Sequence, residues 1–198
     1  MAETAVRLVN AIRDHERLSS TLARAFQNEE ACSFIFPDPQ VRARRLLKMF
    51  RVIVNSDAAN GLLFETMGGE AATLWRAPGK ATGSRTQFLA SLLPFIFALG
   101  SGIGRGLTVS GLIERHHPDV PFWYLHFAGC DPAHQGKGLG GAAIRAGLAR
   151  ADADHLPAYL ETATERNLAL YRSFGFEVSR QWQVPNGPKF WGMLRAPR

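Results

Sequence analysis

The chain has 198 residues, 46% of them hydrophobic and 20% charged, which is enough to bury the core of one globular domain and argues against intrinsic disorder. Basic residues outnumber acidic ones by 23 to 17, and the net charge of +6 points toward an anionic partner such as nucleic acid, a membrane surface or a phosphorylated small molecule. Its two cysteines, Cys32 and Cys130, are too few for a disulfide scaffold.

The chain carries neither a targeting pattern nor a metal-binding pattern. Residues 1–10 lack the basic and apolar segments of a secretory signal. The longest apolar run, residues 88–100, has about half the length of a membrane span and contains Pro94. No HExxH, CxxC or similar spacing predicts a metal site. We therefore expect a soluble, cytoplasmic protein with free thiols, no metal and no membrane partner.

In the first half of the chain, hydrophobic periodicity predicts five elements. Residues 5–9 alternate like a short strand, and residues 12–27 carry apolar side chains at helical spacing. Residues 30–40 contain two prolines and are predicted to form an aromatic loop. A helix is expected over residues 41–56, and residues 61–78 are expected to form two strands joined in a hairpin.

The densest basic run, residues 41–51, contains five basic residues and no acidic one. Its apolar residues recur at helical spacing, which favours an amphipathic helix with a solvated basic face. The alternative is a nucleic-acid-binding surface. No nucleic-acid motif accompanies the run, so we expect no nucleic-acid partner.

The second half begins with residues 86–117, which are predicted to be helical in pieces, interrupted at Pro94 and at the glycines of residues 100–106. Residues 120–130 are rich in aromatic side chains and apolar on both alternating faces, which predicts a central strand covered by helices on each side. A helix is expected over residues 140–154.

The C-terminal part alternates strand, helix and hairpin. Residues 157–161 predict a strand, and residues 162–174 predict a helix. Thr162 and Glu165 match a capping box at the start of that helix, and Gly175 is placed to terminate it. Two strands, over residues 176–184 and 188–194, close the chain. The elements together predict a mixed α/β fold in a single domain, residues 1–198.

A glycine-rich stretch joins the predicted central strand to the next helix. It reads CDPAHQGKGLGGAAI over residues 130–144 and contains Gly136, Gly138, Gly140 and Gly141. A strand that leads through glycines into a helix N-terminus forms an anion site, because free backbone N–H groups and the helix dipole point at the ligand. Lys137 adds a positive charge. The phosphate loop pattern G-x-x-x-x-G-K-[ST] is not met, and the dinucleotide pattern G-x-G-x-x-G lacks its usual strand-to-turn context.

The same stretch meets a third pattern, Q/R-x-x-G-x-G/A, through Gln135, Gly138 and Gly140. Here the sequence resembles the GNAT superfamily of acetyl-CoA-dependent N-acetyltransferases. The further stretches LPAYLET, RNLALYRSFGF and VPNGPKFWGMLR, in this order, resemble most closely the puromycin N-acetyltransferase group, and the resemblance is strong from about residue 117 onward. It implies a mixed, mostly antiparallel twisted sheet flanked by helices on both faces. The acceptor-binding helices would lie mainly in residues 10–117 and the acetyl-CoA-binding core in residues 118–198.

The resemblance also implies a set of coenzyme-binding residues. In this family the loop amides wrap the pyrophosphate, and main-chain groups of the preceding strand bind the pantetheine arm. The residues at those positions are Gln135, Gly136, Lys137, Gly138, Leu139, Gly140 and Gly141 in the loop, and Ala128, Gly129 and Cys130 in the strand. Asn167 is expected to touch the coenzyme.

Three residues are candidates for proton transfer. Tyr171, at the family's tyrosine position, would protonate the leaving thiolate, which a phenol with a pKa near 10 can do at neutral pH. Glu161, at the end of its strand, and His126, which alternation places on one strand face with Ala128 and Cys130, are candidates for the base. Each has a structural alternative: a packed aromatic, a carboxylate that anchors backbone, and a hydrogen-bonded core histidine. Cys130 as a covalent nucleophile lacks a partner histidine.

The resemblance thus implies an enzyme that moves an acetyl group from acetyl-CoA to a primary amine of a small molecule, by direct transfer in a ternary complex. The alternatives are a catalytically silent acyl-CoA-binding sensor and an enzyme that acetylates a protein or peptide amine. The sequence does not identify the acceptor amine. It also does not determine the oligomeric state, for which a homodimer is one possibility.

Overall fold

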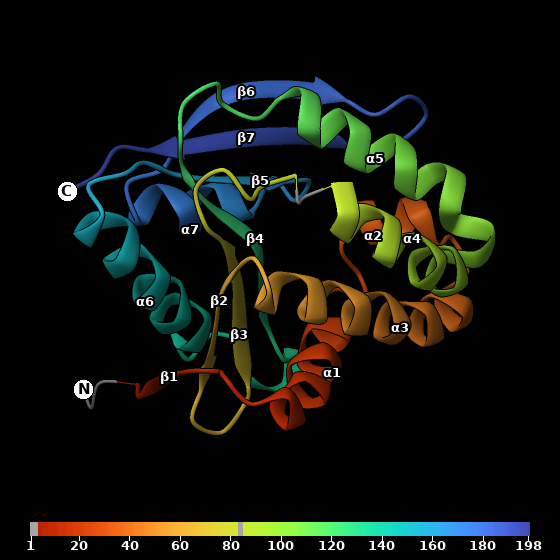
Figure 1. The fold of residues 1–198 in the computed structure, drawn as a ribbon, viewed down its shortest axis with the longest axis horizontal. Helices are drawn as coiled ribbons and strands as arrows, with labels where there is room; N and C mark the ends of the chain where they lie inside the picture. Colours follow the sequence, from red (N-terminus) through yellow and green to blue (C-terminus); the bar gives the residue numbers. More distant parts are fainter. Residues whose placement is uncertain (1–3, 83–84) are drawn as a thin grey trace.

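The computed structural model describes residues 4–82 and 85–198, and one twisted sheet carries strands from both ends of the chain (Figure 1). The strand order is β1-β2-β3-β4-β5-β7-β6, and every neighbouring pair is antiparallel except β4–β5. The strands are β1 (Val6–Leu8), β2 (Gly61–Thr66), β3 (Ala71–Arg76), β4 (Trp123–Cys130), β5 (Ala158–Thr162), β6 (Glu177–Gln183) and β7 (Lys189–Arg195). The mixed, mostly antiparallel sheet is confirmed.

Helices cover both faces of this sheet (Figure 1). One face carries α6 (Leu139–Ala153) and α7 (Asn167–Ser173). The other carries α1 (His15–Ala25), α2 (Glu30–Ile35), α3 (Pro39–Ala58), α4 (Arg85–Leu99) and α5 (Ile103–Arg115). Three short 3₁₀ helices complete the described chain: η1 (Ile12–Asp14), η2 (Gly100–Gly102) and η3 (Pro132–His134).

Each helical layer buries its own hydrophobic cluster against the sheet. The larger cluster lies under α1 and α3 and includes Leu18, Leu22, Phe50 and Val54, none of them more than marginally accessible. The second lies between the sheet and the helices α6 and α7. It is centred on Trp75 and Ile144 and includes Leu168 and Tyr171 of α7. Because the two clusters share the central strands, the sheet is buried on both faces, as the apolar sequence of the central strand predicts.

Local sequence signals were wrong in three places. Residues 30–40 are not a loop: Glu29 caps α2 by accepting a hydrogen bond from the Cys32 N–H, and six residues form a helix before Phe36. Pro94 does not interrupt the helix but lies inside α4, which continues to Leu99. The capping box is also absent, because Thr162 still belongs to β5 and its hydroxyl accepts from Thr164 N–H, so that α7 begins only at Asn167.

The basic helix α3 is confirmed, but its basic face is only partly solvated. Arg42 is buried and donates to the Phe36 carbonyl, and Arg45 donates to the Phe97 carbonyl at the end of α4. Arg51 pairs with Glu16 of α1. These arginines therefore hold α3 to its neighbours, while Arg44 and Lys48 remain exposed.

One long helical stretch is apolar enough to be compared with a membrane span. Within Leu92–Arg115, an 18-residue window has a mean hydropathy of 1.5 and is 28% buried, so by length and composition alone this stretch satisfies the requirement for crossing a membrane. Several apolar side chains there are exposed, among them Leu93, Phe97 and Leu107. The apolar run expected from the sequence covers residues 88–100 and contains Pro94, whereas the helical stretch continues through Pro94 to Arg115. The absence of a membrane partner stays a prediction.

The pairing of β4 positions the rest of the molecule. Along β3, Leu74 pairs with Phe127 and Trp75 with Leu125, so His126 is an extra residue in a β-bulge. On its other edge β4 pairs with β5 only at Trp123–Ala158 and Tyr124–Tyr159. Beyond those pairs β4 continues along β3 and β5 continues along β7, so the two strands diverge.

We expect Gly147→Ala to lower the free energy of unfolding by about 1–3 kcal/mol, because a Cβ at Gly147 would overlap the Trp75 indole on which α6 lies. Gly111→Ala is the matched control: its Cβ meets nothing within 4 Å in the interior of α5, and it should stabilise the protein by about 0.5–1 kcal/mol. Urea unfolding of both variants measures the effect. Equal stability of the two variants would contradict the close contact.

Candidate functional site

The glycine-rich loop leads from the end of β4 into α6, and it is anchored at its base. The Asp131 carboxylate accepts from the Ala133 N–H at 3.0 Å and from Arg24 of α1 at 2.6 Å. The Asp131 N–H donates to the Glu70 carbonyl at 2.7 Å, and the Gln135 amide donates to the Cys130 carbonyl at 3.3 Å. These contacts fix where the loop starts, before its exposed portion.

The exposed portion presents backbone N–H groups that no other backbone group uses. Within the described residues, the amides of Gly136, Lys137 and Gly138 donate to no carbonyl, and Gly138 as N-cap gives α6 no side-chain cap. The 15-residue helix behind them adds the positive end of its dipole. Free amides, the dipole and the exposed Lys137 side chain together make an anion-binding cradle, here defined as residues 135–141.

The glycines of the cradle serve two purposes. Gly136 and Gly138 both have a φ of +78°, a left-handed conformation that β-carbon sterics disfavour in other residues. A Cβ at either would meet nothing within 4 Å, so the space above them is open. Gly141 instead lies close to the Phe174 ring of the α7 C-terminus, 3.3 Å from where a Cβ would stand. Backbone conformation therefore explains the first two glycines, and close helix packing explains the last.

Next to the cradle, the diverging ends of β4 and β5 leave one edge of β4 without a strand. Ala128, Gly129 and Cys130 pair with β3 on their other edge. Ala128 packs toward α6, as does Cys130, whose Cβ lies 3.8 Å from the Cβ position of Gly140. Burial raises the pKa of the Cys130 thiol, which keeps it protonated at neutral pH and does not favour a nucleophilic thiolate.

Tyr171 and Asn167 lie on one face of α7, four residues apart. Tyr171 is buried in the cluster that contains Leu125 and Ile144, and its ring contacts Phe176 edge-on at 6.1 Å. Burial, aided by the negative charge of Glu29, raises the pKa of Tyr171 to about 12. The phenol is therefore protonated throughout the neutral range, as a proton donor must be. Asn167 is half-buried at the first turn of the helix.

His126 does not share a strand face with Ala128 and Cys130, contrary to the alternation of the sequence. The bulge at His126 shifts the pleat, so that Ala128 joins the cluster of Leu125 on the α6 side. His126 turns to the opposite face, where its Nδ1 donates to the Asp57 carboxylate of α3 at 2.7 Å. Asp57 is completely buried and accepts a second bond, from Arg76 Nε, at 2.7 Å.

Asp57 thus joins Arg76 and His126 through hydrogen bonds, and this group of three residues sets the charge state of the imidazole. Burial and the neighbouring charge of Arg76 lower the pKa of His126 to about 4, although Asp57 acts in the other direction. Burial would raise the pKa of Asp57, but His126 and Arg76 hold it below its ordinary value. An ionised Asp57 accepts only, so the proton of the neutral imidazole is on Nδ1 and its Nε2 is a free acceptor.

Glu161 lies on the same face of the sheet as His126. It is buried at the end of β5, with its Oε1 3.2 Å from His117 Nε2, and neither atom has a well-formed hydrogen bond. Burial and the nearby Glu161 carboxylate raise the pKa of Tyr124, whose ring lies 5.1 Å from that of His126. The structure thus brings both candidate bases together around Tyr124, on the face opposite α6.

Sequence reasoning did not identify Asp57, Arg76, His117 or Tyr124. One signal existed for Asp57: it lies three and four residues after Val54 and Ile53, on the apolar face of α3, where an unpaired acid is costly. Nothing local marks its partners, because they come from other elements. Among the described residues, no group of three or more His, Cys, Asp or Glu side chains is arranged to hold a metal ion.

Part of the chain is similar to a known family of sequences. The sequence model of the Acetyltransferase (GNAT) family matches residues 99–176, which include the cradle, β5 and α7. An uncharacterized N-acetyltransferase of Schizosaccharomyces pombe is 26% identical over 177 residues, covering 83% of this chain and 71% of that protein.

Solved structures share the fold over nearly the whole chain. An acetyltransferase from Corynebacterium glutamicum, described as histone acetyltransferase HPA2 and related acetyltransferase, has a TM-score of 0.71 at 20% identity, covering 100% of this chain and 98% of that one. Arylalkylamine N-acetyltransferase 2 of Aedes aegypti has a TM-score of 0.58 at 13% identity, with 98% and 99% coverage. The NatC complex bound to Gag peptide and CoA has a TM-score of 0.53 at 11% identity, with complete coverage of both chains.

The buried, neutral His126 should make stability depend on pH. Its pKa is about 4 in the folded protein and 6.5 ordinarily, so between these values the unfolded chain binds more protons. The free energy of unfolding should therefore fall as the pH drops from 6.5 to 4, by about 3 kcal/mol for this group. His126→Asn keeps an N–H donor for Asp57 but does not titrate, so its stability should fall less over that window.

Urea unfolding at pH 7.5, 6, 5 and 4 provides the measurement. His155→Asn is the control: His155 is exposed, and its φ of 53° suits asparagine, so its pH profile should match that of the unaltered protein. Parallel profiles for His126→Asn and His155→Asn would contradict the assigned charge state of His126.

Proposed function

We propose that this chain is a GNAT-type N-acetyltransferase that transfers the acetyl group of acetyl-CoA to a primary amine of a small molecule, directly and within a ternary complex. The observation that carries the proposal is the position of the open cradle beside diverging strands, with a protonated phenol on one face and a neutral imidazole on the other. Within the family, the sequence motifs favour the puromycin N-acetyltransferase group.

The residues present suit coenzyme A. The free amides of Gly136, Lys137 and Gly138 and the start of α6 would hold the pyrophosphate, joined by Gln135 and the Leu139–Gly141 turn. The edge of β4 that lacks a strand partner, Ala128–Cys130, offers main-chain groups to an extended arm with amide bonds. Asn167 is the side chain of α7 placed for a further polar contact. Bound there, the coenzyme supplies the activated thioester.

In the proposed reaction, His126 Nε2 accepts a proton from the amine, directly or through water, because only a neutral amine attacks a thioester. Asp57 keeps the other ring proton on Nδ1 and so holds Nε2 as the acceptor. The amine nitrogen bonds to the acetyl carbon, the C–S bond breaks, and Tyr171 donates its proton to the departing thiolate. Backbone N–H near Cys130 would stabilise the developing oxyanion. Glu161 lies in the same acceptor region and remains the second candidate for the base.

A small amine suits the acceptor region because its polar groups are enclosed by aromatic side chains. His117 contacts the rings of Phe122, Tyr124 and Tyr159 at 5.0–5.8 Å, and Glu161 is its charged neighbour. Such surroundings favour a cationic or aromatic amine over a long polar chain. Structures with this fold include enzymes named for an arylalkylamine, for agmatine and for a polyamine. The peptide-bound NatC complex keeps a peptide acceptor as the alternative.

Thiol release from acetyl-CoA tests the function. The purified chain is incubated with acetyl-CoA and one amine at a time: an arylalkylamine, agmatine, a polyamine, puromycin and a peptide with a free N-terminus. We expect turnover with at least one small amine at a kcat/KM well above that for the peptide. Turnover with the peptide alone would refute the small-molecule acceptor, and binding of acetyl-CoA without turnover on any amine would identify a silent sensor.

Tyr171→Phe should lower kcat by about 100-fold or more, since it removes the proton donor for the thiolate. The KM for acetyl-CoA should change little, because the ring that packs in the cluster is retained. Phe176→Leu is the control, because it alters the packing of the Tyr171 ring and leaves the phenol in place. A kcat for Tyr171→Phe close to that of Phe176→Leu would rule out the acid role.

A further inference from the structure

The turn between α1 and α2 lies across the opening between β4 and β5, on the face of the sheet opposite α6. At one end of the turn, the ring of Phe26 packs against Phe127 of β4, with the ring centres 5.4 Å apart. A Cβ on Gly129 of the same strand would stand 3.3 Å from the Phe26 ring. At the other end, Glu30 accepts a hydrogen bond from the hydroxyl of Thr164, which follows shortly after β5. The turn therefore has one anchor at β4 and one just beyond β5.

Glu29 lies between these two anchors, and its side chain is half-buried. The Glu29 carboxylate accepts a hydrogen bond from the Cys32 N–H at 2.8 Å, which fixes it at the start of α2. Among the residues that the structure describes, it forms no ion pair with a basic side chain. Burial raises the pKa of Glu29, although the hydrogen bond from Cys32 acts in the other direction. A carboxylate with a raised pKa is a stronger proton acceptor than an ordinary one.

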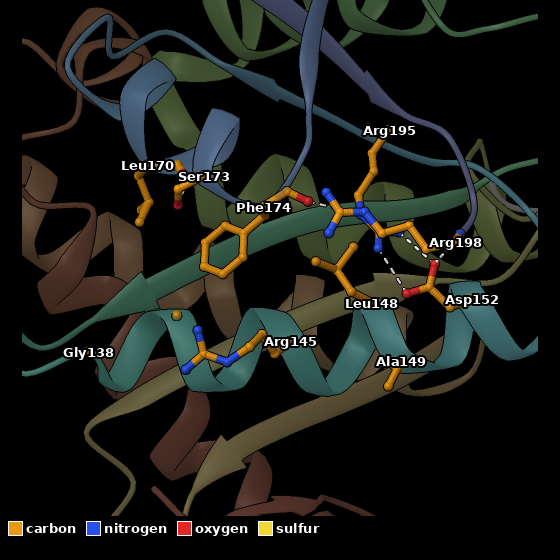
Figure 2. A pocket seen from close by; sticks show the side chains of 11 residues that line it. Gly138, Arg145, Leu148, Ala149, Asp152, Leu170, Ser173, Phe174, Arg195 and Arg198 are labelled. Carbon is orange, nitrogen blue, oxygen red and sulfur yellow. Dashed lines mark hydrogen bonds and ion pairs between the residues drawn. The ribbon is translucent and has the colours of Figure 1, made fainter. Parts of the chain in front are cut away.

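Tyr171 lies on the other face of the sheet, in the cluster between the strands and α6. Its helix is held at the C-terminal end by Arg195, which donates to the Phe174 carbonyl at 3.0 Å and pairs with Asp152 of α6 (Figure 2). The negative charge of Glu29 is near enough to contribute to the raised pKa of Tyr171. A carboxylate on one face and a fixed phenol on the other therefore act on each other at the place where β4 and β5 diverge.

The attacking nitrogen loses two protons in the proposed reaction, and His126 can hold only one of them. The first leaves the ammonium form and gives a neutral amine with two N–H bonds. When the lone pair of this amine forms the C–N bond, the nitrogen becomes positively charged, while the amide product keeps a single N–H bond. A second proton acceptor is therefore needed on the acceptor side of the opening.

We propose that Glu29 is a further catalytic residue, whose carboxylate stabilises the positive nitrogen after attack and takes the second proton from it. The inference rests on the proposed function, because it takes acetyl transfer to an amine as the reaction. The proton passes from the nitrogen to a Glu29 oxygen as the C–S bond breaks, and Tyr171 gives its own proton to the thiolate. The Glu29 proton then returns through water to the Tyr171 phenolate. Both residues regain their starting forms, and the products are the amide and free coenzyme A.

Thiol release with 2-phenylethylamine, agmatine, spermidine and puromycin as acceptors tests the proposal. Glu29→Gln removes the charge, while its amide oxygen can still accept from the Cys32 N–H. We expect kcat to fall by about 100-fold or more, with little change in the KM for acetyl-CoA. In Glu29→Ala, added formate should raise kcat by about 10-fold or more, because a small carboxylate can enter the space that the side chain leaves.

Asp38→Asn is the control. Asp38 is the exposed N-cap carboxylate of α3 and accepts from the Gln40 N–H at 2.8 Å, and asparagine keeps such a cap. Its kcat should match that of the unaltered chain. A kcat for Glu29→Gln close to that of Asp38→Asn, or a loss in Glu29→Ala that formate does not restore, would overturn the proposal and leave acetyl transfer intact. If the unaltered chain acetylates none of these amines, that result would contradict the proposed function itself.

Discussion

The divergence of β4 from β5 is the constraint on which the rest of the site depends. The two parallel strands pair through only two residues each, and the first unpaired positions follow directly after Tyr124 and Tyr159. This divergence leaves the edge of Ala128–Cys130 without a strand, and the cradle follows directly after this edge. A sheet paired along its full length at this point would have no place for an extended arm.

The β-bulge at His126 divides the proposed chemistry between the two faces of the sheet. Leu125 lies in the α6-side cluster that contains Tyr171, so alternation places His126 on the opposite face, and without an extra residue Ala128 would face that opposite side as well. The imidazole meets Asp57 and Arg76 on the α3 side, and a proton acceptor and a proton donor lie on opposite sides of one opening. Bulges often re-aim side chains next to active sites, and this one returns Ala128 to the α6 side while His126 faces α3.

Local sequence patterns predicted those parts of the fold that local interactions form. The β2–β3 hairpin, the central strand, α6 and the C-terminal hairpin all follow from periodicity and turn residues, and the glycine pattern predicted the cradle before α6. Local sequence patterns failed where contacts between residues far apart in the sequence determine the structure. Arg45 of α3 holds the carbonyls at the end of α4, beyond Pro94, and Glu29 caps a helix in a proline-rich segment. Asp57 and His126 are 69 positions apart, so no spacing rule connects them.

The close contact of Gly147 with Trp75 has a consequence for ligand affinity. Trp75 donates to the Thr73 hydroxyl, which in turn donates to the Ala143 carbonyl of α6, so the helix is tied to β3 at two successive turns. These contacts hold the body of α6, and with it the positive end of the helix dipole, in place against the sheet. An anion that binds at the start of α6 therefore does not have to order the helix behind it, which lowers the entropic cost of binding.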